Sequence, residues 1–121
     1  MAKKILIADD SGIVRQVLRT FLEEAQDIEV CAEASNGLEA LEDADRCKPD
    51  VVMLDLSMPK MNGAEVVSIL KKRMPPTKII LFTMYSENVG HSLTSALGVE
   101  AVLSKPNGMG QLVECVRSLL A

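Results

Sequence analysis

Residues 51–55 read VVMLD, four consecutive apolar residues that end in an acid. A run of this length, rich in β-branched side chains, predicts a strand that is covered on both faces. Residues 5–8, ILIA, form a second run of the same kind, and Asp9 and Asp10 follow it. Strands buried on both faces are typical of parallel sheets, because helices pack on both sides of such sheets. The two runs therefore predict a parallel sheet with an acid at the end of each of two strands.

Outward from these runs, short apolar segments alternate with segments whose apolar residues recur at helical spacing. Turn-forming residues such as Asn36-Gly37 and Pro75-Pro76 separate them. The expected strands are Ile5–Ala8, Ile28–Ala34, Val51–Leu54, Ile79–Phe82 and Val99–Leu103, and the expected helices are 13–25, 38–47, 63–74, 89–97 and 109–120.

This order repeats a strand–helix unit five times, which is too few for an eight-fold barrel. The prediction is an α/β fold, a doubly wound five-stranded parallel sheet of the (βα)5, flavodoxin-like kind, with strand order 2-1-3-4-5. The run Ile28–Ala34 alternates apolar and polar residues, which suits a less buried edge strand.

Composition narrows the class of protein. A length of 121 residues predicts a single domain over residues 1–121. The net charge of −4 disfavours direct nucleic-acid binding by this segment. Three widely spaced cysteines indicate neither a disulfide framework nor a zinc site. The short apolar run at the N-terminus is no signal peptide or membrane span, so we expect no membrane association and a cytoplasmic location.

Polar residues follow four of the expected strands, and parallel strands bring their carboxyl ends to one edge, where ligands bind. These residues are Asp9, Asp10, Asp55, Thr83 and Lys105. Each has a simpler reading by itself; Asp10 or Ser11, for instance, could merely cap the following helix. Together they predict a site, because clustered carboxylates suit Mg2+, and a carboxylate beside such an ion can be a nucleophile toward phosphorus.

These residues, together with residues 55–63 (DLSMPKMNG) and Lys105-Pro106, resemble the signature of response-regulator receiver domains. The resemblance covers essentially the whole chain. It implies that Asp55 is the phosphoacceptor and that Mg2+ is held by Asp10 directly, by Asp9 through water, by Asp55 and by the backbone carbonyl of Ser57. It further implies that Lys105 pairs with the carboxylate and then the phosphoryl group, that Thr83 moves to meet the phosphate, and that the Lys105–Pro106 bond is cis.

The resemblance also implies partners. A sensor histidine kinase or phosphotransfer protein would supply the phosphoryl group, and an output protein or fused effector domain would read the switch. The chain would be a signalling phosphoacceptor rather than an enzyme, although it would assist its own phosphorylation and dephosphorylation. One departure is Val102, which stands where the family commonly carries Tyr or Phe, so the chain lacks the ring for the usual aromatic readout.

Three alternatives share parts of this pattern. A flavodoxin-like electron carrier shares the fold class, but aromatic residues make up only 2% of the chain. A phosphohydrolase with an aspartyl nucleophile wants an acid two positions after it, where Ser57 stands. A pseudo-receiver used only for docking is disfavoured by the intact set of site residues.

Overall fold

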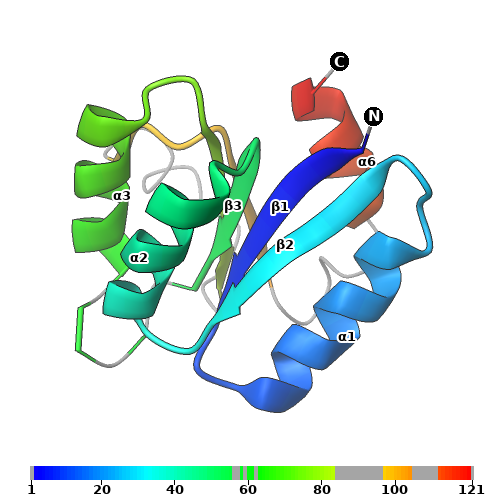
Figure 1. The fold of residues 1–121 in the computed structure, drawn as a ribbon, viewed down its shortest axis with the longest axis horizontal. Helices are drawn as coiled ribbons and strands as arrows, with labels where there is room; N and C mark the ends of the chain where they lie inside the picture. The colour runs from blue at the N-terminus through cyan, green and yellow to red at the C-terminus, as the bar shows by residue number, and fades with distance from the viewer. Residues whose placement is uncertain are drawn as a thin grey trace.

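A computed structural model describes residues 2–55, 58, 60–61, 63–83, 97–104 and 112–120 of the chain. Strands and helices alternate from β1 to β4 in it, and five parallel strands form one sheet (Figure 1). No helix among the described residues has both the length and the apolar content that crossing a membrane requires. The elements are β1 (Lys3–Ala8), α1 (Gly12–Glu23), β2 (Ile28–Ala34), α2 (Gly37–Cys47), β3 (Val51–Leu54), α3 (Gly63–Arg73), β4 (Lys78–Thr83), β5 (Ala101–Ser104) and α6 (Leu112–Leu120).

The strand order is β2-β1-β3-β4-β5, which confirms the predicted order and places β2 at an edge. The register between β1 and β3 matters most for function. Ile5 pairs with Val51 at one end, and Ala8 pairs with Leu54 at the other. The two strands therefore end side by side, and the residue after each strand lies at the same edge of the sheet.

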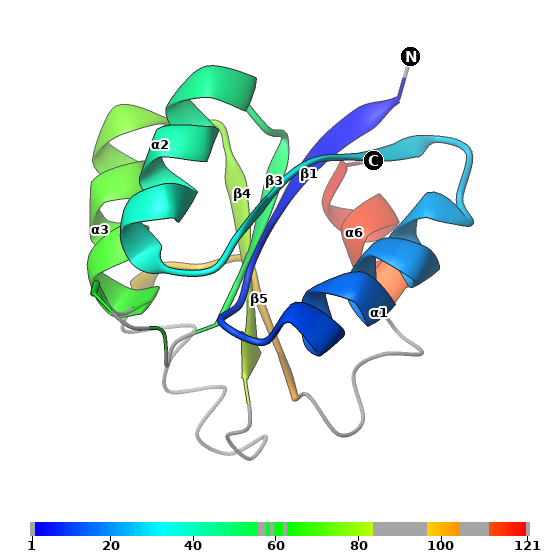
Figure 2. The ribbon, with the colours of Figure 1, turned by 60° about the horizontal axis from the view of Figure 1, so that its bottom comes forward.

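Alternate residues of the strands feed two separate hydrophobic clusters, because successive side chains point to opposite faces of a sheet. Leu6, Val52 and Leu81 lie in the cluster under α2 and α3, whereas Ile7 and Met53 lie in the cluster under α1 and α6. Figure 2 shows the sheet edge-on between these two helix layers. β3 is fully buried along its length, as the uninterrupted apolar run predicts.

The last strand begins later than predicted. The apolar run starts at Val99, which is buried, but β5 begins only at Ala101. The physical reason is the turn before it: Gly98 has a φ of +69°, and the Glu100 carboxylate accepts a hydrogen bond from the Ile79 amide at 2.6 Å. Burial of Val99 thus reflects core packing rather than strand pairing. The predicted helix 89–97 lies almost entirely outside the described residues.

All three cysteines are free and half-buried. Cys47 of α2 donates its thiol proton to the backbone carbonyl of Cys31 in β2, with a sulfur–oxygen distance of 3.6 Å. Burial raises the pKa of the Cys31 thiol to about 12, and the neighbouring Cys47 is the second cause of this rise. Because the thiolate is the reactive form of cysteine, a raised pKa disfavours reaction of Cys31 at neutral pH.

Candidate phosphoacceptor and metal site

The site begins with the ends of β1 and β3. Backbone hydrogen bonds continue the pairing for one residue beyond the end of each strand. The Asp55 amide donates to the Ala8 carbonyl at 2.9 Å, and the Asp9 amide donates to the Ala34 carbonyl at 3.0 Å. The backbones of Asp9 and Asp55 are therefore held by the sheet. Their side chains are also buried, with 1% of Asp9 and 5% of Asp55 exposed.

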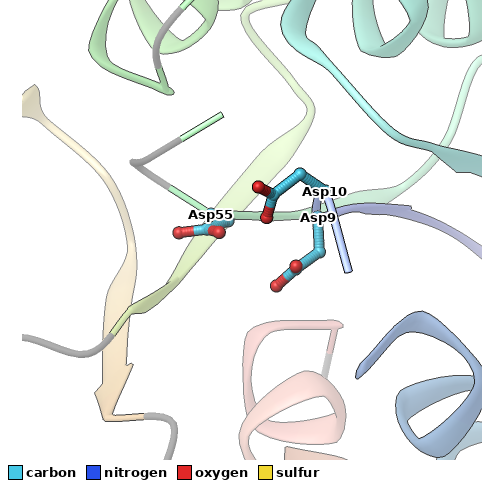
Figure 3. A group of neighbouring side chains, drawn as sticks. All are labelled: Asp9, Asp10 and Asp55. Carbon is cyan, nitrogen blue, oxygen red and sulfur yellow. The ribbon is translucent and has the colours of Figure 1, made fainter. Parts of the chain in front are cut away.

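Three carboxylates meet at this edge. One oxygen from each of Asp9, Asp10 and Asp55 lies within 4.8 Å of the other two. Figure 3 shows the three side chains at the ends of β1 and β3, with the Asp10 carboxylate directed toward Asp55. Asp10 is exposed, so the cluster is open to solvent on one side. Carboxylate oxygens at this spacing are the hard ligands that Mg2+ prefers, and the cluster fits a divalent cation.

The turn into α1 explains why Asp10 is available for this cluster. Ser11 is the N-cap of the helix, and its hydroxyl accepts a hydrogen bond from the Val14 amide at 3.3 Å. The Asp9 carboxylate in turn accepts the Ser11 amide at 2.9 Å. Of the two residues predicted as possible helix caps, Ser11 caps α1 and Asp10 does not. Asp10 therefore does not have the helix-capping duty that offered the simpler reading of this position.

Of the other predicted site residues, Thr83 lies among the described residues, whereas Ser57 and Lys105 do not. Thr83 is the last residue of β4, paired in register with Ser104 at the end of β5, so its backbone lies at the same edge of the sheet as the acids. Ser57, Lys105 and the Lys105–Pro106 bond lie outside the described residues. Val102 is half-buried on β5 and packs against the hydrophobic cluster under α2 and α3.

The chain after Asp55 is anchored by packing. Met58 is buried in the cluster under α2 and α3. The backbone of Met61 lies so close to Gly37, at the start of α2, that a Cβ on Gly37 would come within 2.3 Å of the Met61 carbonyl oxygen. Asn36, the N-cap of α2, is also buried. The Asn36-Gly37 pair, predicted only as a turn, thus also leaves room for the segment that follows the acid.

One polar contact at the site was not predicted from the sequence. Arg15, one turn into α1, donates from Nη1 to the backbone carbonyl of Asp9 at 2.7 Å. The helical pattern identifies Arg15 only as a polar position between apolar ones. No local signal distinguishes it from Arg19, which lies one turn further along the same helix.

Comparison with known proteins agrees with this geometry. The family described as "Response regulator receiver domain" matches residues 5–117. The transcriptional regulatory protein YhcZ of Bacillus subtilis, described as uncharacterized, is 48% identical over 84 residues, which are 69% of this chain and 39% of that protein. A protein-glutamate methylesterase/protein-glutamine glutaminase of Pyrococcus horikoshii is 40% identical over 84 residues, 69% of this chain and 23% of that protein.

Among solved structures, the REC domain of AraT, a response regulator from Geobacillus stearothermophilus, has a TM-score of 0.85 and 37% sequence identity. The match covers 98% of this chain and 93% of that one. The chain spans only 23% to 56% of the length of the curated relatives quoted above and of the VraR response regulators. The family match over residues 5–117, on a sheet of the expected order with three acids at its carboxyl edge, shows that the chain belongs to the response regulator receiver domains.

Proposed function

We propose that Asp55 is the phosphoacceptor of this receiver domain and that Asp9, Asp10, Asp55 and the Ser57 carbonyl hold Mg2+ beside it. The observation that carries the proposal is the cluster of three carboxylates within 4.8 Å at the carboxyl edge of the sheet. Asp55 is the acid that directly follows the central strand β3, and Asp9 and Asp10 follow its neighbour β1.

In the proposed reaction, a carboxylate oxygen of Asp55 attacks the phosphorus of a phosphohistidine on a sensor histidine kinase or phosphotransfer protein. The new bond joins oxygen to phosphorus, the phosphorus–nitrogen bond breaks, and the imidazole nitrogen keeps the electron pair. Mg2+ would neutralise charge on the transferring group. Lys105 and Thr83 would contact the phosphoryl oxygens, as the family resemblance implies.

The conformational readout is proposed to run through the backbone at the ends of β4 and β5. Val102 is half-buried against the core and β-branched, so it cannot swing between a buried and an exposed position as an aromatic ring can. Thr83 ends the neighbouring strand, and its movement toward a phosphoryl group would shift this strand end directly.

An output protein or a fused effector domain would read this change, in keeping with relatives that are longer than this chain. The net charge of −4 supports an output that does not involve nucleic-acid binding by this segment itself. A cytoplasmic location stays a prediction from the sequence.

The test is phosphorylation by a small donor. Intact-protein mass spectrometry after incubation with acetyl phosphate and Mg2+ should show one added phosphoryl group, and chelation of Mg2+ before the donor is added should prevent it. Peptide mapping of the borohydride-reduced adduct should place the modification on Asp55. No adduct with Mg2+ present, or an adduct on another residue, would contradict the proposal.

A further inference from the structure

The peptide group that joins Asp9 to Asp10 accepts a hydrogen bond from a side chain outside the cluster. The ladder of β1 ends at Ala8, so the Asp9 carbonyl lies one residue beyond the paired strand. Arg15 of α1 reaches back to this carbonyl, with a distance of 2.7 Å from Nη1 to the oxygen. On the other side of the residue, the Asp9 carboxylate accepts the Ser11 amide at 2.9 Å.

Arg15 is itself oriented by the edge strand. Its Nε lies 3.4 Å from a carboxylate oxygen of Glu33 in β2, and Glu33 pairs in register with Ile7 of β1. Both side chains are largely sheltered, with 21% of Arg15 and 26% of Glu33 exposed. The planar guanidinium can satisfy two acceptors at a fixed angle, which a flexible ammonium cannot do as well. Glu33, Arg15 and the Asp9 carbonyl therefore form a continuous bridge from β2 through α1 to the end of β1.

We propose that Arg15 is a positioning residue of the metal site. By holding the Asp9 carbonyl, it fixes the plane of the peptide bond that precedes Asp10, and the hydrogen bond of the Ser11 amide fixes the plane that follows it. The two planes together determine the direction in which the Asp10 side chain leaves the backbone. Asp10 then points toward Asp55, as Figure 3 shows. This inference rests on the proposed function, because it concerns the same cation.

The charge of Arg15 and its geometry act in opposite directions, which makes the proposal testable. A guanidinium beside a cation site repels the cation, so loss of the charge alone would tighten Mg2+ binding. Loss of the hydrogen bond that orients the segment carrying a metal ligand would weaken Mg2+ binding. Groups that orient metal ligands typically contribute about tenfold or more in metal affinity. We therefore expect Arg15→Gln to bind Mg2+ about tenfold more weakly than the unmodified chain.

Arg19 provides a matched control on the same helix. It carries the same charge and also pairs with Glu33, but its other partner is Glu23 rather than the Asp9 carbonyl. Arg19→Gln should leave Mg2+ affinity unchanged or slightly tighter. Arg15→Lys, which keeps the charge and its repulsion of the cation but lacks the planar fork, should bind Mg2+ more weakly than the unmodified chain.

The measurement is a titration of the metal-free full chain with MgCl2, followed by the amide resonances of Asp10 and Ser11. Amide hydrogen exchange at the same two residues, without metal, should be faster in Arg15→Gln and unchanged in Arg19→Gln. Thermal unfolding checks that each variant is folded. If Arg15→Gln does not fold, Arg15→Lys decides, since weakened Mg2+ binding supports the proposal and unchanged binding overturns it.

Equal Mg2+ affinities for Arg15→Gln and Arg19→Gln, or tighter binding by Arg15→Gln, would overturn the positioning role while leaving the proposed function intact. An unmodified chain that binds no Mg2+ at all would instead contradict the proposed function.

Discussion

Two aspartates lie at opposite ends of strand β3, and their surroundings differ. Asp50 precedes the strand, and its carboxylate accepts the Lys4 amide at 2.8 Å. The backbone of Asp50 is also hydrogen-bonded to both neighbouring strands, β1 and β4. Its amide donates to the Lys4 carbonyl at 2.8 Å, and its carbonyl accepts the Lys78 amide at 3.0 Å. Asp55 follows the strand, is 5% exposed, and lies beside two further carboxylates.

The direction of the strands explains this difference. The amino ends of parallel strands present backbone N–H groups, and an acid there can accept one of them. Glu100, before β5, does the same for the Ile79 amide and also accepts a hydrogen bond from Lys71 at 2.7 Å. At the carboxyl ends of β1 and β3, Asp9, Asp10 and Asp55 lie beside one another instead. Acids at the amino edge therefore stabilise the sheet, whereas acids gathered at the carboxyl edge repel one another and favour a cation.

The largest expected effect is on phosphoryl uptake, which should depend on Asp55 but not on Asp50. Asp55→Asn should abolish phosphoryl uptake from acetyl phosphate with Mg2+, because an amide oxygen is a poor nucleophile toward phosphorus. Asp50→Asn should be phosphorylated like the unmodified chain, since its amide oxygen can still accept the Lys4 N–H. Intact-protein mass spectrometry measures both. A stoichiometric adduct on Asp55→Asn, or none on a folded Asp50→Asn, would break the comparison.

The next effect concerns the cation. Asp10→Ala removes one of the three clustered carboxylates but no helix cap, because Ser11 caps α1. We expect Mg2+ affinity to fall by about 100-fold, equivalent to about 2.7 kcal/mol, while the fold is retained. The readout is the rise in Tm on adding Mg2+, since a ligand that binds only the folded state stabilises it. Asp10→Ala with the same Mg2+-dependent rise in Tm as the unmodified chain would exclude Asp10 as a ligand.

A smaller effect tests how the segment after Asp55 is held. Gly37→Ala would place a Cβ 2.3 Å from the Met61 carbonyl oxygen and 2.7 Å from its Cβ, so α2 and this segment must move apart. We expect the free energy of unfolding to fall by about 2 kcal/mol, within the usual range for overpacking.

Gly12→Ala is the control for Gly37→Ala. A Cβ on Gly12 would meet only Arg15 Nη2 at 3.5 Å, an ordinary contact. Its free energy of unfolding should be unchanged within about 0.5 kcal/mol or slightly higher. Urea denaturation measures both variants, and equal stabilities would show that the close approach of Gly37 and Met61 does not constrain the fold.

The smallest effect belongs to the amino edge. Burial alone would raise the pKa of Glu100, but hydrogen bonds from Lys71 and the Ile79 amide outweigh it and hold the pKa below its ordinary value. A carboxyl whose folded pKa is lowered stabilises the protein above its unfolded pKa, about 4.3, and loses that contribution as pH falls through the folded pKa. Glu100→Gln should therefore reduce the free energy of unfolding by about 1 kcal/mol at pH 6. The difference should shrink at pH 3.

Urea denaturation of Glu100→Gln at the two pH values is the measurement. A difference that stayed constant between pH 6 and pH 3 would show that the charge of Glu100 contributes nothing beyond its role as a hydrogen-bond acceptor.

Much of the fold was determined by the sequence itself. The burial of residues 5–8 and 51–54 could be predicted from their composition, because a strand covered on both faces must be apolar throughout. The alternation of strands and helices then restricts the sheet to a few topologies, and the observed order is the predicted one. The proximity of Asp9, Asp10 and Asp55 follows from that topology alone, since it depends only on where two strands end.

The contacts that hold these acids in place were decided only by the tertiary structure. Arg15 and Arg19 are equivalent in the helical pattern, yet only Arg15 donates to the Asp9 carbonyl, because the docking of α1 on the sheet sets which guanidinium reaches it. Lys71 and Glu100 are separated by 29 residues, and no local pattern pairs them. Burial leaves a periodic trace in the sequence, whereas the direction of a long side chain is settled only when separate elements pack together.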